Sequence, residues 1–223
     1  METASAIARF NMVHQQLRPW GVLDERVLEV MGALEREQFV PDAYRALAYA
    51  DIEIPLPNGD RMLAPKLVGH LLQALAIQSG ERALEIGTGS GYMAACLRRL
   101  GARVVSMEID PAQAAEARAR LEALGLTGID VREGDGLVGS IFGGPFDTIA
   151  VNGSVPDESA LSNLKRQLKE DGRLVCILGQ GPAMSCMRLT RVNERDYRRE
   201  SLFETWAPPL IQPVRAKEKA FVF

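Results

Sequence analysis

The sequence predicts an α/β fold built on a mostly parallel sheet, and two regularities of the chain indicate it. After Ser79-Gly80, short β-rich runs alternate with helical runs, as in a parallel sheet covered by helices on both faces and wound right-handedly. Before that point the pattern is helical, so residues 1–78 are predicted to form a helical N-terminal segment. A length of 223 residues suits a single domain with a sizeable core.

The N-terminal segment contains three predicted helices, at residues 4–16, 24–34 and 65–78. Asp24 is the expected N-cap of the second helix, because its side chain can accept a hydrogen bond from a free backbone N–H. Pro65 suits the first helical position of the third, where no N–H is needed. This third helix has one apolar stripe that should be buried, made of Leu67, Val68, Leu71, Leu72 and Leu75.

The remainder of the chain supplies the sheet. Five β-rich runs are predicted strands, at residues 82–86, 102–109, 129–133, 146–151 and 173–178, and three helices are expected between them, at 92–100, 111–124 and 158–168. Two further β-rich runs, 185–192 and 199–206, have no helix between them. They predict an antiparallel hairpin at the sheet edge, with the charged residues between them as its solvated loop.

The run "ALEIGTGSGYMA", residues 83–94, is the strongest local signal for a ligand site. A strand leads into Gly87, Thr88, Gly89 and Gly91 and then into a helix. Glycines let the backbone turn sharply and approach a ligand closely, and the helix start offers free N–H groups. The spacing is G-x-G-x-G and an acidic residue, Glu85, precedes it, which disfavours a dinucleotide site.

Two acidic positions after the next strands point to the same site. Glu108 ends the second strand, where a carboxylate can accept hydrogen bonds from both hydroxyls of a ribose. Asp135 and Gly136 follow the third strand, and Gly136 would let the backbone lie flat beside a base. The alternatives are a solvated strand end for Glu108 and an Asx turn for Asp135. Since all three loops follow neighbouring parallel strands, we expect them to form one crevice.

Composition and charge exclude several classes of protein. No apolar run is long enough to span a membrane and no secretion signal is present, which favours the cytoplasm. Cys96, Cys176 and Cys186 show no CxxC spacing and are expected to be buried free thiols. Two histidines without a partner at ligand spacing predict no metal site, and a net charge of −3 gives no case for nucleic acid.

Together, "LEIGTGSGY", "SMEID", "GDG" and "PFDTIAV" resemble the class I S-adenosylmethionine-dependent methyltransferases. More narrowly, "MVHQQLRPWGVLDERVLEVM", "REQFVP", "AYADIEIPL" and "LKEDGRLVCILG" resemble the protein-L-isoaspartate O-methyltransferase family over roughly residues 10–210. The resemblance implies a Rossmann-like, doubly wound seven-stranded sheet with one antiparallel strand. It also implies repair of proteins by methylation of isoaspartyl carboxyl groups, with S-adenosyl-L-methionine as cofactor.

The same resemblance assigns cofactor contacts to the three loops: Glu85, Gly87, Thr88, Gly89, Gly91, Glu108, Asp135 and Gly136. The chemistry makes modest demands, because the cofactor carries the reactive methyl group and the protein mainly aligns the acceptor and excludes water. A carboxylic acid with a pKa near 4 is already ionised at about pH 7, so no general base is required.

The segment 59–65 departs from the family on the acceptor side. The family reads Gly-Gln-Thr-Ile-Ser-Gln-Pro where this chain has "GDRMLAP", so Leu63 replaces the serine expected to assist the substrate and Arg61 replaces the threonine. Arg61 is a candidate for binding the acceptor carboxylate directly, or a solvated arginine of a turn. Asn152 or Ser154 is a candidate replacement donor, or part of a simple turn.

Three functions therefore remain open at this stage. The first is isoaspartyl carboxyl methylation of a protein or peptide, the second is methylation of a different acceptor such as a small molecule, and the third is cofactor binding without catalysis. The expected organisation is one methyltransferase domain, with a helical segment (1–78), a cofactor-binding core (79–180) and a C-terminal hairpin and tail (181–223). The apolar "AFVF" of the tail is expected to pack as a strand or to dock on a neighbouring surface, which includes another copy of the chain.

Overall fold

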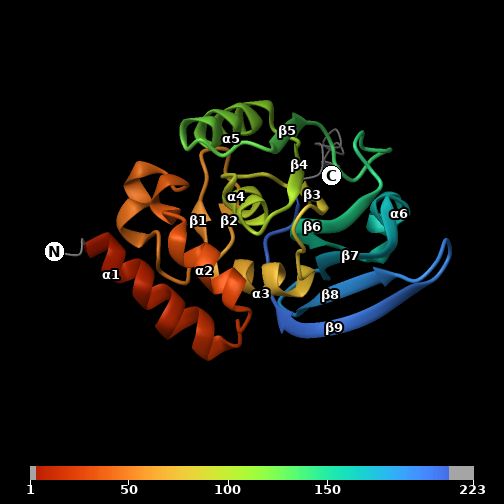
Figure 1. The fold of residues 1–223 in the computed structure, drawn as a ribbon, viewed down its shortest axis with the longest axis horizontal. Coiled ribbons are helices and arrows are strands. Elements are labelled where there is room, and N and C mark those ends of the chain that lie inside the picture. Colours follow the sequence, from red (N-terminus) through yellow and green to blue (C-terminus); the bar gives the residue numbers. More distant parts are fainter. Residues whose placement is uncertain (1–3, 211–223) are drawn as a thin grey trace, which may run out of the picture.

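A seven-stranded sheet runs through the computed structural model, which describes residues 4–210 (Figure 1). Its order is β5-β4-β3-β6-β7-β8-β9, with β8 antiparallel to both neighbours and the other pairs parallel, which confirms a mostly parallel sheet with one reversed strand. The strands are β3 (Arg82–Ile86), β4 (Arg103–Glu108), β5 (Ile129–Glu133), β6 (Phe146–Val155), β7 (Leu168–Leu178), β8 (Met184–Arg191) and β9 (Tyr197–Thr205).

Helices cover both faces of this sheet (Figure 1). Successive side chains of β3 point to opposite faces, so Ala83 belongs to one hydrophobic core and Leu84 to the other. The first core joins the N-terminal segment to the sheet, and α6 packs into the second through Leu164. The helices are α1 (Ala4–Asn11), α2 (Glu25–Ala33), α3 (Pro65–Leu75), α4 (Tyr92–Arg99), α5 (Pro111–Ala123) and α6 (Ser162–Arg166).

The N-terminal helices form where the sequence predicts them, with different ends. The Asp24 side chain accepts a hydrogen bond from the Arg26 backbone N–H, which confirms it as the N-cap of α2. The first helix widens into a π-helical turn at Met12–Leu17 instead of continuing as α-helix to residue 16. The apolar stripe of α3 is buried as predicted, but the helix ends at Leu75 because Ala76 takes a left-handed conformation, with φ of 47°.

Two predicted boundaries around β6 and β7 are wrong. Residues 158–168 do not form one helix, because a 3₁₀ turn at Glu158–Leu161 precedes the short α6. Leu168 instead starts β7, where it pairs with Phe146 and is fully buried. The second error is the end of β6, which continues to Val155 because its last residues pair with the end of β7.

A small hairpin precedes α3 that the sequence pattern did not reveal. Its strands are β1 (Ile54–Pro55) and β2 (Arg61–Met62), each two residues long. A tight turn joins them, in which Gly59 has a φ of 88° and the Asp60 backbone N–H donates to Asn58 Oδ1 at 3.0 Å. Strands this short have no detectable alternation, so the sequence pattern could not predict them. The chain also forms 3₁₀ turns at Arg36–Gln38 and Asp42–Leu47.

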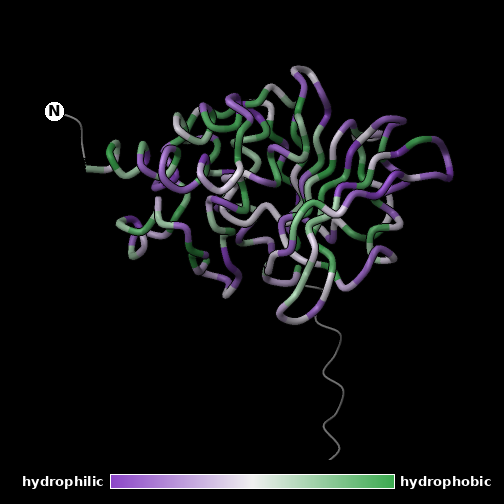
Figure 2. The backbone as a smooth tube through the Cα atoms, turned by 90° about the horizontal axis from the view of Figure 1, so that it is seen from below, coloured by the Kyte–Doolittle hydropathy of each residue, from purple (hydrophilic) through white to green (hydrophobic). Residues whose placement is uncertain are grey.

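The C-terminal hairpin of β8 and β9 forms the sheet edge as predicted, and Figure 2 shows its hydrophilic tip projecting from the body. Residues 193–196 at this tip are exposed. All three cysteines are buried free thiols. None of the helices described between residues 4 and 210 is long and apolar enough to cross a membrane. The predicted packing of the "AFVF" tail lies outside the described residues.

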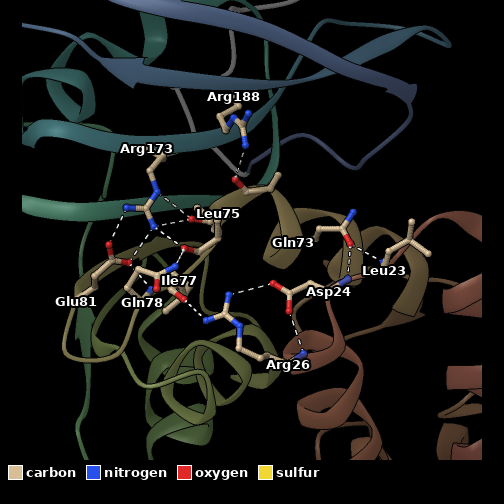
Figure 3. A network of polar contacts seen from close by, with 12 residues as sticks. Leu23, Asp24, Arg26, Gln73, Leu75, Ile77, Gln78, Glu81, Arg173 and Arg188 are labelled. Carbon is tan, nitrogen blue, oxygen red and sulfur yellow. Dashed lines mark hydrogen bonds and ion pairs between the residues drawn. The ribbon is translucent and has the colours of Figure 1, made fainter.

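A polar network ties the N-terminal helices to the sheet (Figure 3). The Arg173 guanidinium of β7 binds both carboxylate oxygens of Glu81, at 2.7 and 2.9 Å, and donates to the Leu75 carbonyl oxygen at the end of α3. One layer further out, Gln73 Oε1 accepts from the backbone N–H groups of Leu23 and Asp24. Carbonyls at a helix end lack partners within the helix, so Arg173 satisfies groups that burial would otherwise leave unpaired.

Replacing Arg173 should therefore destabilise the fold. Arg173→Met keeps the aliphatic stem but removes the ion pair of Glu81 and the hydrogen bonds to the Leu75 carbonyl oxygen, and we expect a loss of about 2–4 kcal/mol in the free energy of unfolding. Urea denaturation measures it. Arg18→Met is the matched control, because Arg18 binds Glu25 through the same two-point geometry on the exposed surface and should cause no measurable loss. Equal effects of the two changes would contradict the prediction.

Candidate functional site

The crevice predicted from three separate loops exists at the carboxyl-terminal edge of the sheet. β3, β4 and β5 are parallel neighbours, so the loops that follow them meet at one edge. Two adjoining cavities lie there. The first cavity lies between segment 60–63 and the glycine loop, and the second cavity lies between Gly87, Glu108 and residues 134–137.

The glycine loop has the backbone conformation that its sequence predicts. Gly87, Gly89 and Gly91 have φ values of 86°, 50° and 83°, a region that other residues resist. Gly87 and Gly89 line the first cavity, whereas Gly91 lies behind it at the start of α4. A Cβ atom on Gly91 would lie 3.4 Å from the side chain of Leu121, an ordinary contact, so the positive φ rather than lack of space favours glycine there.

Thr88 and Glu108 hold the glycine loop against β4. The Thr88 hydroxyl lies 2.5 Å from that of Ser106, and both are buried. Glu108 Oε2 accepts from the Gly89 backbone N–H at 2.8 Å, and its Oε1 accepts from that of Asp110 at 3.1 Å. Each carboxylate oxygen can accept a second hydrogen bond. Glu108 also lines the second cavity, so it is placed both to shape the loop and to bind a ligand's hydroxyls.

Asp135 and Gly136 form the far wall of the second cavity. One Asp135 oxygen accepts from the Leu137 backbone N–H at 2.9 Å, so the Asx turn considered as an alternative is present at a residue that also lines the cavity. A Cβ on Gly136 would lie 2.7 Å from Ile86 Cδ1 and 3.0 Å from Met107 Cβ, so both side chains would have to shift to admit it. Glycine therefore allows the close approach of this loop to the ends of β3 and β4.

Glu85 lies beneath the crevice rather than in it. Its carboxylate is fully buried and accepts from the Ser106 hydroxyl at 2.5 Å and from Asn152 Nδ2 at 2.6 Å. Burial raises the pKa of Glu85 to about 8, although the hydrogen bonds from Ser106 and Asn152 favour its charged form. Glu85 does not line either cavity, and its contacts are with the residues that shape the crevice.

Asn152 lines the first cavity but does not provide the free donor considered from the sequence. Its Nδ2 donates to Glu85 and also to the Gly87 carbonyl oxygen at 3.1 Å, so the donor group is already engaged. Its Oδ1 is buried without a hydrogen-bond partner among the described residues. An unpaired buried acceptor is costly, and an ammonium group bound in the cavity would satisfy it. These residues therefore fit the amino-acid end of S-adenosylmethionine.

The other candidate donor, Ser154, lies elsewhere. Its backbone N–H donates to the Pro208 carbonyl oxygen at 2.8 Å, and its carbonyl oxygen accepts from the Leu210 N–H at 3.0 Å. Ser154 thus holds the end of the described chain against β6, and it lines a separate apolar cavity with Trp206. The Leu210 side chain then covers the glycine loop, since a Cβ on Gly87 would lie 3.1 Å from Leu210 Cδ2.

On the acceptor side, Arg61 and Leu63 both line the first cavity. The Leu63 side chain is buried, and its carbonyl oxygen accepts from the buried Arg36 guanidinium at 2.9 Å. The Arg61 side chain is about half exposed, at 53%, and lies 3.8 Å from Glu53 Oε2. Arg61 is therefore a solvated side chain of a hairpin that also borders the cavity, and its binding of the acceptor carboxylate stays a prediction.

Sequence reasoning missed Asp60, which lines both cavities. One of its oxygens accepts from the Arg61 backbone N–H at 2.7 Å, and burial raises the pKa of its carboxyl. Its place in the turn "NGD" concealed it, because an aspartate in a turn is ordinarily explained by local hydrogen bonding. The available signal was its position beside the two residues that depart from the family pattern.

The described residues 4–210 contain no group of three His, Cys, Asp or Glu side chains arranged to hold a metal ion.

Four features together define a Rossmann-like methyltransferase that uses S-adenosylmethionine. They are the order of the parallel strands, the glycine loop after β3, the carboxylate ending β4 and the Asp-Gly turn after β5.

Comparison with known proteins narrows this class. The model of the protein-L-isoaspartate(D-aspartate) O-methyltransferase family matches residues 8–208. A protein-L-isoaspartate O-methyltransferase from Methylorubrum populi is 40% identical over 94% of this chain and 97% of its own length. One from Koribacter versatilis is also 40% identical, over 94% of this chain and 93% of its own. The chain therefore belongs to the protein-L-isoaspartate(D-aspartate) O-methyltransferase family.

Solved structures support the same fold. A protein-L-isoaspartate O-methyltransferase superposes with a TM-score of 0.80 at 24% identity, over 92% of this chain and 66% of that one. A Plasmodium falciparum structure in complex with S-adenosyl-L-homocysteine superposes with a TM-score of 0.77 at 19% identity, over 94% of this chain and 99% of that one.

The buried Glu85 predicts a particular pH dependence of stability. Its pKa is about 8 in the folded protein, above the ordinary value of 4.5 that applies in the unfolded chain. Between these values the unfolded state binds fewer protons, so stability should fall as the pH rises from about 5 to about 8. Glu85→Gln removes this titration, so the loss in the free energy of unfolding between about pH 5 and about pH 8 should shrink by a few kcal/mol. Urea unfolding at several pH values measures it, with the exposed Glu133→Gln as control; a Glu85→Gln profile as steep as that of the wild type would contradict the assignment.

Proposed function

We propose that this protein transfers the methyl group of S-adenosylmethionine to the side-chain carboxyl group of isoaspartyl residues, and so acts in protein repair. The observation that carries the proposal is the 40% identity to proteins named for this activity, over nearly the full length of both chains. Residues 1–223 would act as one methyltransferase domain, with damaged proteins or peptides as substrates. We infer a cytoplasmic location, in keeping with three buried thiols that form no disulfides.

The crevice supports a division of roles among its residues. We assign the ribose hydroxyls of the cofactor to Glu108 and its base to the turn at Asp135 and Gly136. The amino-acid end falls to Asn152 Oδ1 and the glycine loop. Glu85, Thr88 and Gly91 act indirectly, since their contacts keep the loop and α4 in place.

The reaction needs little more than alignment in a dry cavity. When bound, S-adenosylmethionine supplies an activated methyl group. The acceptor carboxylate is already ionised near neutral pH, so the protein need not remove a proton. Leu63, Val68 and Met93 give the first cavity an apolar wall that excludes water. Arg61 at its border would orient the acceptor through a charge-assisted hydrogen bond.

The test is formation of a methyl ester on an isoaspartyl peptide, preceded by titration calorimetry with S-adenosylmethionine. We expect binding and an ester yield above the rate without enzyme. Leu63→Ser restores the hydroxyl of the family, and we expect it to raise kcat/KM by about tenfold because a hydrogen bond to a charged acceptor is gained. Cofactor binding without any ester would overturn the proposed acceptor.

Methylation of a different acceptor is the second candidate, and the acceptor side of the crevice favours it. Leu63 and Arg61 replace the two hydroxyl groups of the family, and Asp60 brings a carboxylate to the same wall. If this candidate is correct, the protein binds the cofactor with family-like affinity, and Leu63→Ser does not create isoaspartyl activity.

Arg61 should contribute to acceptor binding alone. Arg61→Met removes the cation that borders the first cavity, so we expect KM for the isoaspartyl peptide to rise by about tenfold while the Kd for S-adenosylmethionine stays unchanged. Steady-state kinetics and calorimetry measure the two. The matched control is Arg45→Met, because Arg45 is equally exposed and paired with Asp42 but lies away from the cavity. An unchanged KM in Arg61→Met would assign Arg61 to the solvated turn.

A further inference from the structure

Two residues of the described chain, Gly87 and Asp60, line both cavities of the crevice. Gly87 has no side chain, so Asp60 is the described residue with a side chain at the passage where the two cavities adjoin. Any ligand that occupies both cavities passes this side chain.

The residues that line the two cavities indicate how such a ligand lies. The second cavity has the Glu108 carboxylate and the Asp135 turn, which suit a nucleoside. The first is lined by Asn152, whose Oδ1 has no hydrogen-bond partner between residues 4 and 210, which suits an ammonium group. A ligand with its nucleoside in the second cavity and its amino-acid end in the first carries its connecting sulfur through the junction. This placement rests on the proposed cofactor assignment.

Charge is what distinguishes the methyl donor from its product at that sulfur. S-adenosylmethionine has a sulfonium cation there, whereas S-adenosylhomocysteine has a neutral thioether. Asp60 is half-buried, and burial raises the pKa of its carboxyl because a charge is poorly solvated there. One of its oxygens accepts from the Arg61 backbone N–H, but the Arg61 guanidinium is directed to Glu53. A cation in the passage would therefore interact favourably with Asp60.

We propose that Asp60 is a specificity-determining residue that makes the crevice prefer the sulfonium donor over its demethylated product. Attraction between opposite charges is strong where water is partly excluded, and it vanishes when the sulfur becomes neutral. The interaction thus favours the donor and assists release of the product after transfer. The family resemblance places a neutral glutamine at this position, so the selectivity would be a property of this chain.

Titration calorimetry with the two ligands measures the selectivity without catalysis. For the wild type we expect S-adenosylmethionine to bind more tightly than S-adenosylhomocysteine. Asp60→Asn keeps the size and the oxygen that accepts from the Arg61 N–H, and removes only the charge. The selectivity is the Kd of S-adenosylhomocysteine divided by the Kd of S-adenosylmethionine. We expect Asp60→Asn to reduce this ratio by about tenfold, because the donor binds more weakly, while the Kd of the product changes by less than about twofold.

Glu53→Gln is the matched control. Glu53 is a carboxylate on the same hairpin that lies against Arg61 and, unlike Asp60, does not line either cavity. We expect it to leave the ratio within about twofold, because the effect depends on contact with the passage rather than on net charge. Asp60→Gln serves as a second neutral variant, and thermal melting of each variant establishes that it is folded.

The outcomes separate this inference from the proposed function. If the wild type binds neither ligand, the cofactor assignment itself fails. If it binds both, but Asp60→Asn and Asp60→Gln weaken both equally or weaken neither, Asp60 does not sense the charge and the inference is overturned while the cofactor assignment stands. An equal loss of selectivity in Glu53→Gln would also overturn it, because the field of the whole hairpin would then be responsible.

Discussion

The crevice depends on a buried carboxylate that joins three neighbouring strands. Glu85 of β3 accepts from Ser106 of β4 and from Asn152 of β6, while Ser106 contacts Thr88 and Asn152 contacts the Gly87 carbonyl. Ser106 and Asn152 thus hold the glycine loop from its two sides, and both donate a hydrogen bond to Glu85. A desolvated carboxyl is costly, and its pKa of about 8 records that cost. The hydrogen bonds from Ser106 and Asn152 offset this cost only if β3, β4 and β6 keep their relative positions. Displacing one of these strands would therefore weaken the contacts of the other two.

The two sides of the crevice differ in how strongly the structure constrains their residues. The cofactor side consists of backbone turns and short hydrogen bonds on rigid strand ends, and its glycines are favoured by positive φ values or, at Gly136, by the close approach of neighbouring side chains. The acceptor side is a hairpin of two-residue strands with half-exposed charges at Asp60 and Arg61. Ile54 and Met62 anchor this hairpin in the core, whereas the side chains of Asp60 and Arg61 are only partly buried, so these two can change with little effect on the fold. This difference explains why a chain can keep the cofactor residues of its family and depart from it at Asp60 and Arg61.

Most of the fold could be predicted because its signals are local. Alternating strands and helices, the cap at Asp24 and the stripe of α3 depend on residues close in sequence, and all are present. The errors in the strands occur where pairing with a distant segment decides the result. Leu168 joins β7 because Phe146 lies opposite it, and the N-terminal strands form only across the turn at Gly59. No property of either segment by itself distinguishes these outcomes.

For the site, the sequence by itself determined which loops meet and which cofactor they suit, because glycine and carboxylate positions after parallel strands follow from topology. It did not determine what each side chain faces. Only the tertiary structure buried Glu85 below the crevice, left the Asn152 oxygen without a partner among residues 4–210, and placed Asp60 in the lining of both cavities. These outcomes depend on contacts between residues more than 60 positions apart, such as Glu85 with Asn152, and burial and hydrogen-bond satisfaction at that range are properties of the packed chain.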